Sequence, residues 1–491
     1  MKWPCTTAAA LTVALRLVML PVLPPPEPRA HDEFGYLLGA DTFASGRLTN
    51  PPHAMWEHFE TMHVNMLPTY QMKYPPAQGV ALAFGQVVFG SPWAGVLLTG
   101  AALAAALCWM LLVWLPPGWA FGATMAATIK VGVLGYWMNS YWGGSIAAAA
   151  GALVIGAAAR LTRDPQPRLA AAAAFGAVVL ANSRPFEGAL LCLIAGAICL
   201  PRIRRDAIPR LAGPAAAVML AGVAAMALYN YRGSGHATRM PYVEHQRQYG
   251  AAPVLLTQAD FPAPVYRHAA LKRFWDWDRG YYVTARENPG FTLLSLILEA
   301  MPFFVSIPMI PAFLWGVRKQ PRLGAALALF LGALCLERWL QAHYLASAMG
   351  VIVLLVAVGF REMDRRLALA LLVGAVAFKA WTWKPRYFTG YEVAFVDDRR
   401  RVLGELERSE GKDLVLVRYS ADHSIFDEWV YNSADIDASR VVWAREMSPE
   451  KDREIVAYFK DRKVWVLDAD AKPARLTSYT PAVQAAVRRT E

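Results

Sequence analysis

Charged residues are scarce in this chain. Only 18% of its 491 residues are Asp, Glu, Lys or Arg, whereas a typical soluble domain contains roughly 25%. Hydrophobic residues make up 56% of the chain and gather in long apolar segments. The composition therefore excludes an ordinary water-soluble globular protein and predicts a membrane protein with many helical spans.

Paired cysteines are also missing. The five cysteines show none of the spacings of a zinc site or a disulfide framework, and we expect them to be buried thiols. All of them lie in apolar segments, at Cys5, Cys108, Cys192, Cys199 and Cys335. No internal repeat of the kind that marks transporters is evident.

Apolar segments of about the length of a membrane span recur along the first 385 residues. A helix needs about 20 apolar residues to cross the hydrocarbon core, and we predict about eleven spans. The first is expected to be retained rather than cleaved as a signal peptide, and a short helix at 77–90 lies at the membrane. The segments are 6–23, 94–115, 118–137, 143–161, 168–182, 187–200, 209–229, 293–315, 321–337, 341–360 and 365–382.

Four short connections between these segments are strongly basic. They are 160–168, 201–210, 316–322 and 361–366. Short loops rich in Arg and Lys stay on the cytoplasmic side of a membrane. With the predicted number of spans, all four fall on the same side as the N-terminus at Met1–Lys2. The net charge of +11 is thus largely a topology signal, and we expect no nucleic-acid partner.

The composition changes near residue 385. The segments 413–420, 440–447 and 463–469 read as buried strands, and helical apolar spacing occurs at 397–409 and 449–461. We therefore predict a mainly α fold, in which residues 1–385 form a polytopic transmembrane helical bundle. Residues 386–491 are expected to form a small extracytoplasmic α/β domain with a partly parallel sheet. No glycine-rich phosphate loop opens a helix in it, so the sequence assigns that domain no chemistry.

Polar residues collect on the face opposite the basic connections. They occupy a first outer loop (24–76), a large outer loop (230–292) and the short segments 139–145, 182–188 and 337–344. Polar groups at membrane depth are costly and usually line cavities. The sequence therefore predicts one pocket at the membrane surface, and the loop 230–292 can cover it as a lid.

Two kinds of charged residue are expected at this pocket. A carboxylate positioned against a hydroxyl serves as a general base, and guanidinium or ammonium groups bind phosphate. This combination suits transfer from a phosphate-linked lipid to a hydroxyl acceptor. An acidic pair in a loop is nevertheless more often solvated surface, and interfacial arginines often only snorkel. The acidic candidates are Asp32, Glu33, Glu57, Glu60 and Glu187, and the basic ones are Lys73, Arg184 and Arg338.

The order of motifs resembles that of the membrane glycosyltransferases of the C superfamily. A first span is followed by "HDEFGYLLGADTFASGRL" and then by "KYPP", which opens a helix before many further spans. The resemblance covers residues 1–385 and is closest to the protein O-mannosyltransferase and aminoarabinose-transferase branch. It implies a bacterial, inverting hexosyl- or pentosyltransferase with a polyprenyl-phosphate-linked sugar as donor. The acceptor would be a hydroxyl on a glycan, lipid or protein.

The resemblance also implies roles for particular residues. Asp32 would be the general base, with Glu33 orienting the acceptor or sharing that role, and Lys73 would approach the donor phosphate. Arg184, Arg338 and His343 are further candidates for phosphate binding. The predicted substrate pocket contains Tyr74, Tyr141, Trp142, Glu187 and Tyr344.

No cofactor is certain from the sequence. Some relatives bind a divalent metal near the first outer loop, and the candidate ligands here are His58, Glu60 and His63. The implied location is a bacterial inner membrane within the cell envelope, with the active site and the C-terminal domain on the periplasmic side. A transporter or flippase of a lipid-linked saccharide is the alternative, and an anchored scaffold is a third hypothesis.

Overall fold

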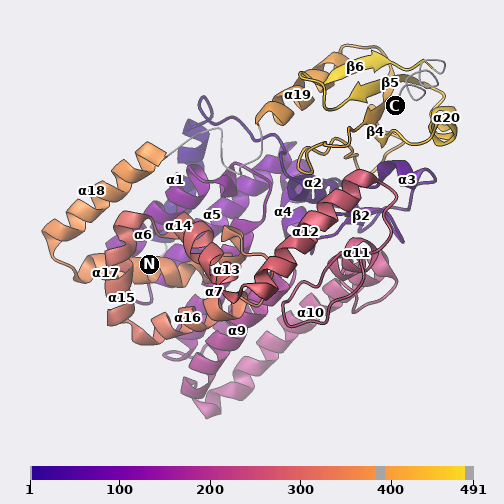
Figure 1. Cartoon of the computed structure of the whole chain (residues 1–491). Helices are drawn as coiled ribbons and strands as arrows, with labels where there is room; N and C mark the ends of the chain where they lie inside the picture. The colour runs from indigo at the N-terminus through magenta and orange to yellow at the C-terminus, as the bar shows by residue number, and fades with distance from the viewer. Residues whose placement is uncertain (1–2, 383–392, 481–491) are drawn as a thin grey trace.

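The computed structural model describes residues 3–382 and 393–480 of the chain. It is mainly helical, with a small sheet region close to the C-terminus (Figure 1). Met1–Lys2 and the predicted domain boundary near residue 385 lie outside the described residues.

Apolar helices form the part of the chain before residue 382. Many of them begin with proline in the first turn, where the missing N–H leaves no intrahelical bond unmade. Short 3₁₀ and π-helical turns join several of them. The helices are α1 (Trp3–Val18), α4 (Ala77–Phe89), α5 (Pro92–Leu111), α6 (Pro117–Thr128), α7 (Gly144–Leu161), α8 (Pro167–Ala181), α9 (Pro185–Cys199), α10 (Ile208–Ser234), α13 (Pro289–Ser295), α14 (Met301–Phe304), α15 (Ile310–Lys319), α16 (Pro321–Leu334), α17 (Met349–Glu362) and α18 (Arg365–Thr382).

Within the described residues, 5 helical segments are long and apolar enough to cross a membrane. They are Pro92–Leu111, Gly144–Leu161, Pro185–Arg202, Arg205–Ser234 and Ala342–Glu362. Three shorter apolar helices, α1, α8 and α16, lie in other predicted spans, and a fourth, α4, is the short helix predicted at 77–90. These helices suit a membrane protein, and the total of about eleven spans stays a prediction.

The segment predicted as one span at 293–315 is not a straight helix. Gly290–Phe304 and Ile307–Lys319 form a pair of apolar helices bent by 86°. Pro308 lies at the start of the second piece, and proline can neither donate the helical hydrogen bond nor fit behind the preceding turn. Hydropathy alone does not reveal such a break.

The four basic connections each join two successive apolar helices, at the ends away from the polar segments. They join α7 to α8, α9 to α10, α15 to α16, and α17 to α18. The other ends of these helices carry the polar segments near Trp142, Arg184 and Arg338. Because α7, α8, α9 and α10 pack along one another, the basic connections lie at the helix ends away from those polar segments.

The first outer loop is folded. It contains α2 (His31–Ala44), α3 (Trp56–Phe59) and an antiparallel ribbon of β1 (Val64–Asn65) and β2 (Gln71–Met72). The acidic pair Asp32 and Glu33 lies in the first turn of α2, where carboxylates interact favourably with the positive end of the helix dipole. Helix α2 is buried on most of its circumference.

A close helix pair follows the "KYPP" segment. Helix α4 packs against α5 at Gly85 and Gly95, where an added Cβ on either glycine would collide with the backbone of the other helix. Small residues permit this kind of approach between apolar helices. The pair fixes the chain directly after Lys73, which lies four residues before α4 begins.

The large outer loop also contains helices, α11 (Pro241–Tyr249) and α12 (Ala269–Glu287). In Figure 1 they lie beside α2 and α3 and below the C-terminal domain. Helix α12 buries Phe274, Trp275, Asp278 and Tyr282 on one face. This segment is therefore a structured cover and not a linker.

The C-terminal domain is a four-stranded sheet with two helices. Strand β3 pairs in parallel with β4 and β5, and β6 pairs antiparallel with β5, giving the order β4-β3-β5-β6. The predicted strands at 413–420, 440–447 and 463–469 and the partly parallel sheet are confirmed. The elements are α19 (Val393–Glu407), β3 (Lys412–Arg418), β4 (Val441–Arg445), α20 (Pro449–Tyr458), β5 (Arg462–Asp468) and β6 (Arg475–Ser478).

Both faces of this sheet are covered, as expected for parallel strands that read as continuous apolar runs. One face packs against α19 through residues such as Val415 and Val402. The other face packs against the first outer loop: Leu414 and Leu416 share a core with Phe34 and Phe59. The C-terminal domain is thus joined to α2 and α3 by a common hydrophobic core.

Candidate active site

A cavity of about 570 Å³ lies where several segments meet. The first outer loop supplies Asp32, His63 and Lys73, and α12 supplies an aromatic wall that includes Trp277. Further lining residues come from the segment 337–344, from the large outer loop, and from Trp142, Ser424, Phe426 and Asp427. The cavity therefore combines charged groups and aromatic faces, as the sequence analysis predicts for the outer pocket.

Asp32 is held at the cavity by a tyrosine. The hydroxyl of Tyr74 donates a 2.5 Å hydrogen bond to Oδ1 of Asp32, and 30% of the Asp32 side chain remains exposed. The Tyr74 ring stacks on Tyr36, with 4.4 Å between the centroids. Burial and the nearby Asp32 charge raise the pKa of Tyr74 well above its usual value, so its hydroxyl stays a donor. The second carboxylate oxygen, Oδ2, does not take part in this bond, and the residue lines the cavity.

Unlike Asp32, Glu33 does not line the cavity and is bonded to backbone N–H groups. Its Oε1 accepts from the backbone N–H of Arg29 and Ala30, at 3.1 and 3.2 Å, and its Oε2 accepts from that of Tyr141 at 3.0 Å. The side chain is buried and does not line the cavity. Burial raises the pKa of Glu33 to about 7, against the opposing effect of these hydrogen bonds. Of the acidic pair, only Asp32 faces the cavity, and Glu33 fixes the first turn of α2.

Lys73 is paired with a histidine. Its ammonium donates a 2.8 Å hydrogen bond to Nδ1 of His63, and its backbone N–H donates to the His63 carbonyl at 3.1 Å. Burial lowers the pKa of Lys73 to about 8, although the Asp32 charge opposes that effect. Burial and the Lys73 charge also hold the pKa of His63 well below its usual value. The imidazole is therefore neutral, and its Nε2 carries the proton and faces Oδ2 of Asp32 at 3.9 Å.

The other predicted phosphate-binding residues differ in their partners. Arg338 is buried against Asp278, with 2.8 Å between NH2 and Oδ2, and also donates to the Ala252 and Pro253 carbonyls. Arg184 lies 3.5 Å from Glu187 and stacks over the ring of Tyr344. Among the described residues Lys73 has no carboxylate within 4.0 Å. It is therefore the most available of the three cations.

The remaining predicted pocket residues divide into two groups. Trp142, His343 and Tyr344 line the cavity, and Nδ1 of His343 lies 3.1 Å from the Tyr136 hydroxyl. Tyr141 instead donates its hydroxyl to the Pro26 carbonyl at 3.0 Å. Tyr74, Tyr141, Arg184 and Glu187 support the lining from behind and are not part of it.

The candidate metal ligands do not converge. Nδ1 of His58 lies 2.9 Å from the Arg445 carbonyl, Glu60 accepts from the Tyr249 hydroxyl at 3.0 Å, and His63 faces Lys73. A divalent ion needs several donors around one point. Over residues 3–382 and 393–480, no group of three or more His, Cys, Asp or Glu side chains meets in that way. In this arrangement His58, Glu60 and His63 therefore do not fit a metal ion.

Sequence reasoning missed several lining residues. Phe274, Trp277, Asp278 and Tyr281 follow an i, i+3, i+4, i+7 spacing on α12, which places them on one helix face, and all four line the cavity. That spacing was available in "RFWDWDRGYY". In contrast, nothing local marks Ser424 to Asp427 as part of the cavity wall, because the fold alone brings this C-terminal loop to α2.

The comparisons with known proteins identify the fold. No family model and no curated sequence matches the chain. Its structure is similar to that of apo ArnT from Cupriavidus metallidurans, with a TM-score of 0.54 and 12% identity over 93% of this chain and 92% of ArnT. ArnT bound to undecaprenyl phosphate gives a TM-score of 0.48 and 15% identity over 82% and 70%.

An archaeal structure is also similar. The apo oligosaccharyltransferase of Archaeoglobus fulgidus gives a TM-score of 0.50 and 10% identity over 95% of this chain and 70% of that chain. At such identities the likeness concerns the fold. The chain therefore has the fold that ArnT and the archaeal oligosaccharyltransferase share.

Proposed function

We propose that this protein transfers a sugar from a polyprenyl-phosphate-linked donor to an acceptor hydroxyl. The observation that carries the proposal is the placement of Asp32 and Lys73 on one cavity wall in a chain with this fold. A carboxylate that can accept a proton and a cation that can bind phosphate are the two groups that such a transfer requires.

Lys73 is the proposed contact for the donor phosphate. Lys73 lines the cavity and has no carboxylate within 4.0 Å among the described residues, and it is near enough to Arg184 and Arg338 for both to lower its pKa. A phosphate would relieve this repulsion between cations. ArnT, whose fold is similar, has been crystallised with undecaprenyl phosphate, which supports a lipid phosphate as the ligand.

Asp32 is the proposed general base. As the acceptor oxygen forms its bond to the anomeric carbon, its proton passes to Oδ2 of Asp32. The bond between the anomeric carbon and the phosphate oxygen breaks, and its electron pair leaves with the phosphate. Lys73 stabilises the charge that develops there. Attack from the face opposite the phosphate inverts the anomeric carbon, and Glu33 contributes by fixing the helix turn.

The acceptor side is proposed to be the aromatic wall. Trp142, Trp277 and Tyr281 offer flat faces to a sugar ring, and the carboxyl group of Glu337 also lines the cavity. Such a wall suits a hydroxyl on a glycan, lipid or protein, with a hexose or pentose transferred. Because the basic connections lie at the opposite helix ends, the cavity is proposed to face the periplasm of a bacterial inner membrane.

The test is a transfer assay in native membranes with a panel of polyprenyl-phosphate sugars. Asp32→Asn keeps the acceptor for the Tyr74 hydroxyl but removes the base, and we expect transfer to fall by about 10²–10⁴-fold at equal protein abundance. Asp41→Asn is the matched control, because Asp41 lies on the same helix and bonds the Ala434 N–H at 2.7 Å.

Two results would contradict the proposal. Full activity in Asp32→Asn would remove this carboxylate from the mechanism. If the wild-type protein turns over no lipid-linked sugar but moves one across the bilayer of proteoliposomes, the alternative of a transporter or flippase would replace the transferase.

A further inference from the structure

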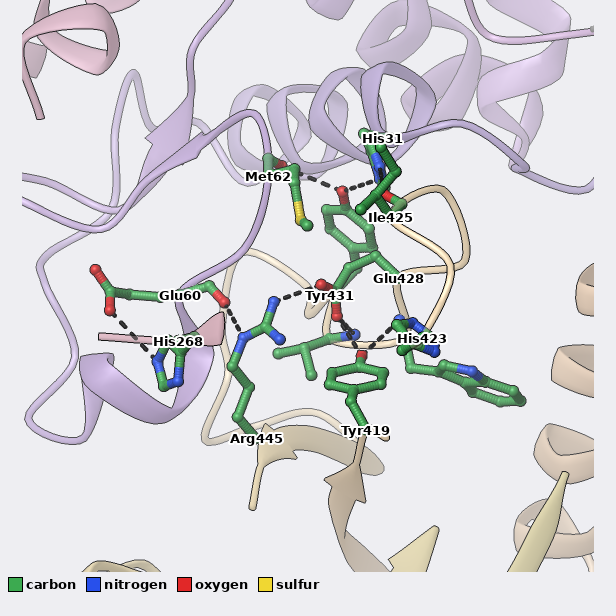
Figure 2. A network of polar contacts seen from close by, with 12 residues as sticks. His31, Glu60, Met62, His268, Tyr419, His423, Ile425, Glu428, Tyr431 and Arg445 are labelled. Carbon is green, nitrogen blue, oxygen red and sulfur yellow. Dashed lines mark hydrogen bonds and ion pairs between the residues drawn. The ribbon is translucent and has the colours of Figure 1, made fainter. Parts of the chain in front are cut away.

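The residue before Asp32 is held by the C-terminal domain. Nε2–H of His31 donates a 2.7 Å hydrogen bond to the carbonyl of Ile425. Because Nε2 is thereby the donor, Nδ1 is an acceptor, and the Tyr431 hydroxyl donates to it at 3.0 Å (Figure 2). The ring is 2% exposed, and burial lowers the pKa of His31, which keeps the imidazole neutral. Both nitrogens of His31 are thus bound by residues about 400 positions away.

Tyr431 is itself fixed in place. Its ring stacks on Phe34 at 4.2 Å and 2° between planes, and its hydroxyl lies 3.2 Å from the carbonyl of Met62. Phe34 is in α2 and Met62 is next to His63. One tyrosine of the C-terminal domain therefore contacts both stretches of the first outer loop that supply polar groups to the cavity.

A buried ion pair supports the loop that carries Tyr431. Glu428 pairs with Arg445, accepts from the Tyr419 hydroxyl and accepts from the Val430 N–H at 2.9 Å. Arg445 in turn donates from Nε to the carbonyl of Glu60 at 2.6 Å (Figure 2). Both charged side chains are about 2% exposed. A buried pair with satisfied partners tolerates little displacement, because an unpaired charge in this place is costly.

The two neighbours of Asp32 are therefore anchored to different parts of the molecule. Glu33 is bonded to the backbone of Tyr141 in the helical part, and His31 is bonded to Ile425 and Tyr431 in the C-terminal domain. His31, Asp32 and Glu33 all belong to the first turn of α2. Asp32 lies between these two anchors and is itself bonded to the Tyr74 hydroxyl.

We infer that the C-terminal domain is part of the catalytic machinery, and that His31 is the positioning residue through which it orients Asp32. The same domain closes the cavity with Ser424 and Phe426. The inference rests on the proposed role of Asp32. It gives the C-terminal domain a function in orienting the base, beyond bracing the outer loops.

The experiment compares Tyr431→Phe with Tyr458→Phe in the full-length protein in detergent. Tyr431→Phe keeps the ring that stacks on Phe34 and removes only the hydroxyl bonded to His31. Tyr458→Phe removes a hydroxyl of the same domain that bonds Asp437 at 3.0 Å, away from His31. We expect Tyr431→Phe to lower kcat about tenfold, with KM for donor and acceptor within about twofold, because misplacement affects the reacting geometry more than binding.

A second pair of variants tests His31 directly. The side-chain amide of His31→Gln can still donate to the Ile425 carbonyl, whereas His31→Ala cannot. We expect the glutamine variant to retain about tenfold more kcat than the alanine variant. Equal losses in both variants, or an unchanged kcat in Tyr431→Phe, would overturn the inference.

Hydrogen exchange separates this inference from the proposed function. Backbone amides of residues 30–36 and 58–64 should exchange several-fold faster in Tyr431→Phe than in Tyr458→Phe, whether or not the protein is a transferase. If the wild type shows no transfer, the proposed function fails and this exchange difference alone decides whether the anchor exists. Equal exchange in the two variants would refute the anchor itself.

Discussion

The Lys73 ammonium donates to Nδ1 of His63 at 2.8 Å, and Nε2 of the same ring faces Oδ2 of Asp32 at 3.9 Å. One neutral imidazole thus links the proposed phosphate contact to the proposed base. His63 adopts φ of 65°, a left-handed conformation that costs a non-glycine residue about 1–3 kcal/mol and that clusters at functional sites. In this conformation the His63 ring lies between Lys73 and Asp32.

Transfer should be lost on the alkaline side as Lys73 loses its proton. Burial lowers the pKa of Lys73 to about 8, so its ammonium form exists below that pH and disappears above it. We expect kcat/KM for the donor to fall about tenfold per pH unit above that value, because this parameter reports groups of the free enzyme. Initial rates at several donor concentrations, from roughly pH 6.5 to 9.5, measure the profile.

Lys73→Arg is the control for that profile. An arginine remains charged throughout this pH range, so the alkaline fall should be absent even if the absolute rate is lower. An alkaline limb that persists unchanged in Lys73→Arg would assign the titration to another group.

Tyr74→Phe should impair the chemical step. The variant keeps the stack on Tyr36 and removes the donor to Asp32, so the carboxylate gains freedom to rotate. We expect kcat to fall about tenfold while KM for the donor is nearly unchanged. Tyr229→Phe is the comparison, because that hydroxyl bonds the Tyr74 carbonyl at 3.3 Å. Similar losses in both variants would point to a general disturbance of the 73–76 segment.

Glu33→Gln should act mainly on stability. Both Glu33 oxygens accept from backbone N–H groups, and an amide nitrogen in place of one oxygen would face a donor. We expect a loss of about 1–3 kcal/mol in the free energy of unfolding, as for a buried donor left unsatisfied. Thermal unfolding in detergent measures it. A variant of normal stability that has lost all transfer would instead show a direct role of Glu33 in the reaction.

The effects of Arg338 and Asp278 on the free energy of unfolding should be coupled. Removing a single partner leaves a buried, uncompensated charge, and we expect Arg338→Met to cost about 3–5 kcal/mol. Arg338→Met with Asp278→Leu should cost less than the sum of the two single changes. A double-mutant cycle on the free energy of unfolding checks this, and additive losses would contradict the pairing. Donor KM in the double variant then shows whether Arg338 also binds phosphate.

Much of the fold follows from local patterns. The strands at 413–420 and 463–469 are largely apolar runs, and the apolar segments at 143–161 and 209–229 are helices, because long apolar runs are visible in the composition alone. The broken segment at 293–315 does not follow in this way. Its bend depends on where Pro308 meets neighbouring helices, and hydropathy averages over that position.

Those residues of the candidate site that lie in short recognisable motifs could be predicted from the sequence. Asp32 and Lys73 stand near recognisable motifs, and the structure brings both to one cavity. The different contacts of His31, Asp32 and Glu33 in "HDE" could not be predicted from the sequence. His31 and Glu33 are defined by their partners, Ile425 and Tyr141, and no local pattern gives the spatial neighbours of a residue hundreds of positions away.

The core shared by Phe34 and Leu414 also sets an order of assembly. At synthesis rates of about 5–20 residues per second, β3 follows α2 from the ribosome after roughly 20–80 s. Throughout that interval α2 has one apolar face without its cover and His31 without its two partners. A nascent chain released before β3 is synthesised would therefore insert its helices, but α2 in the first outer loop would lack the cover that β3 provides. In the full-length chain, the proposed activity would begin only after β3 has docked on α2.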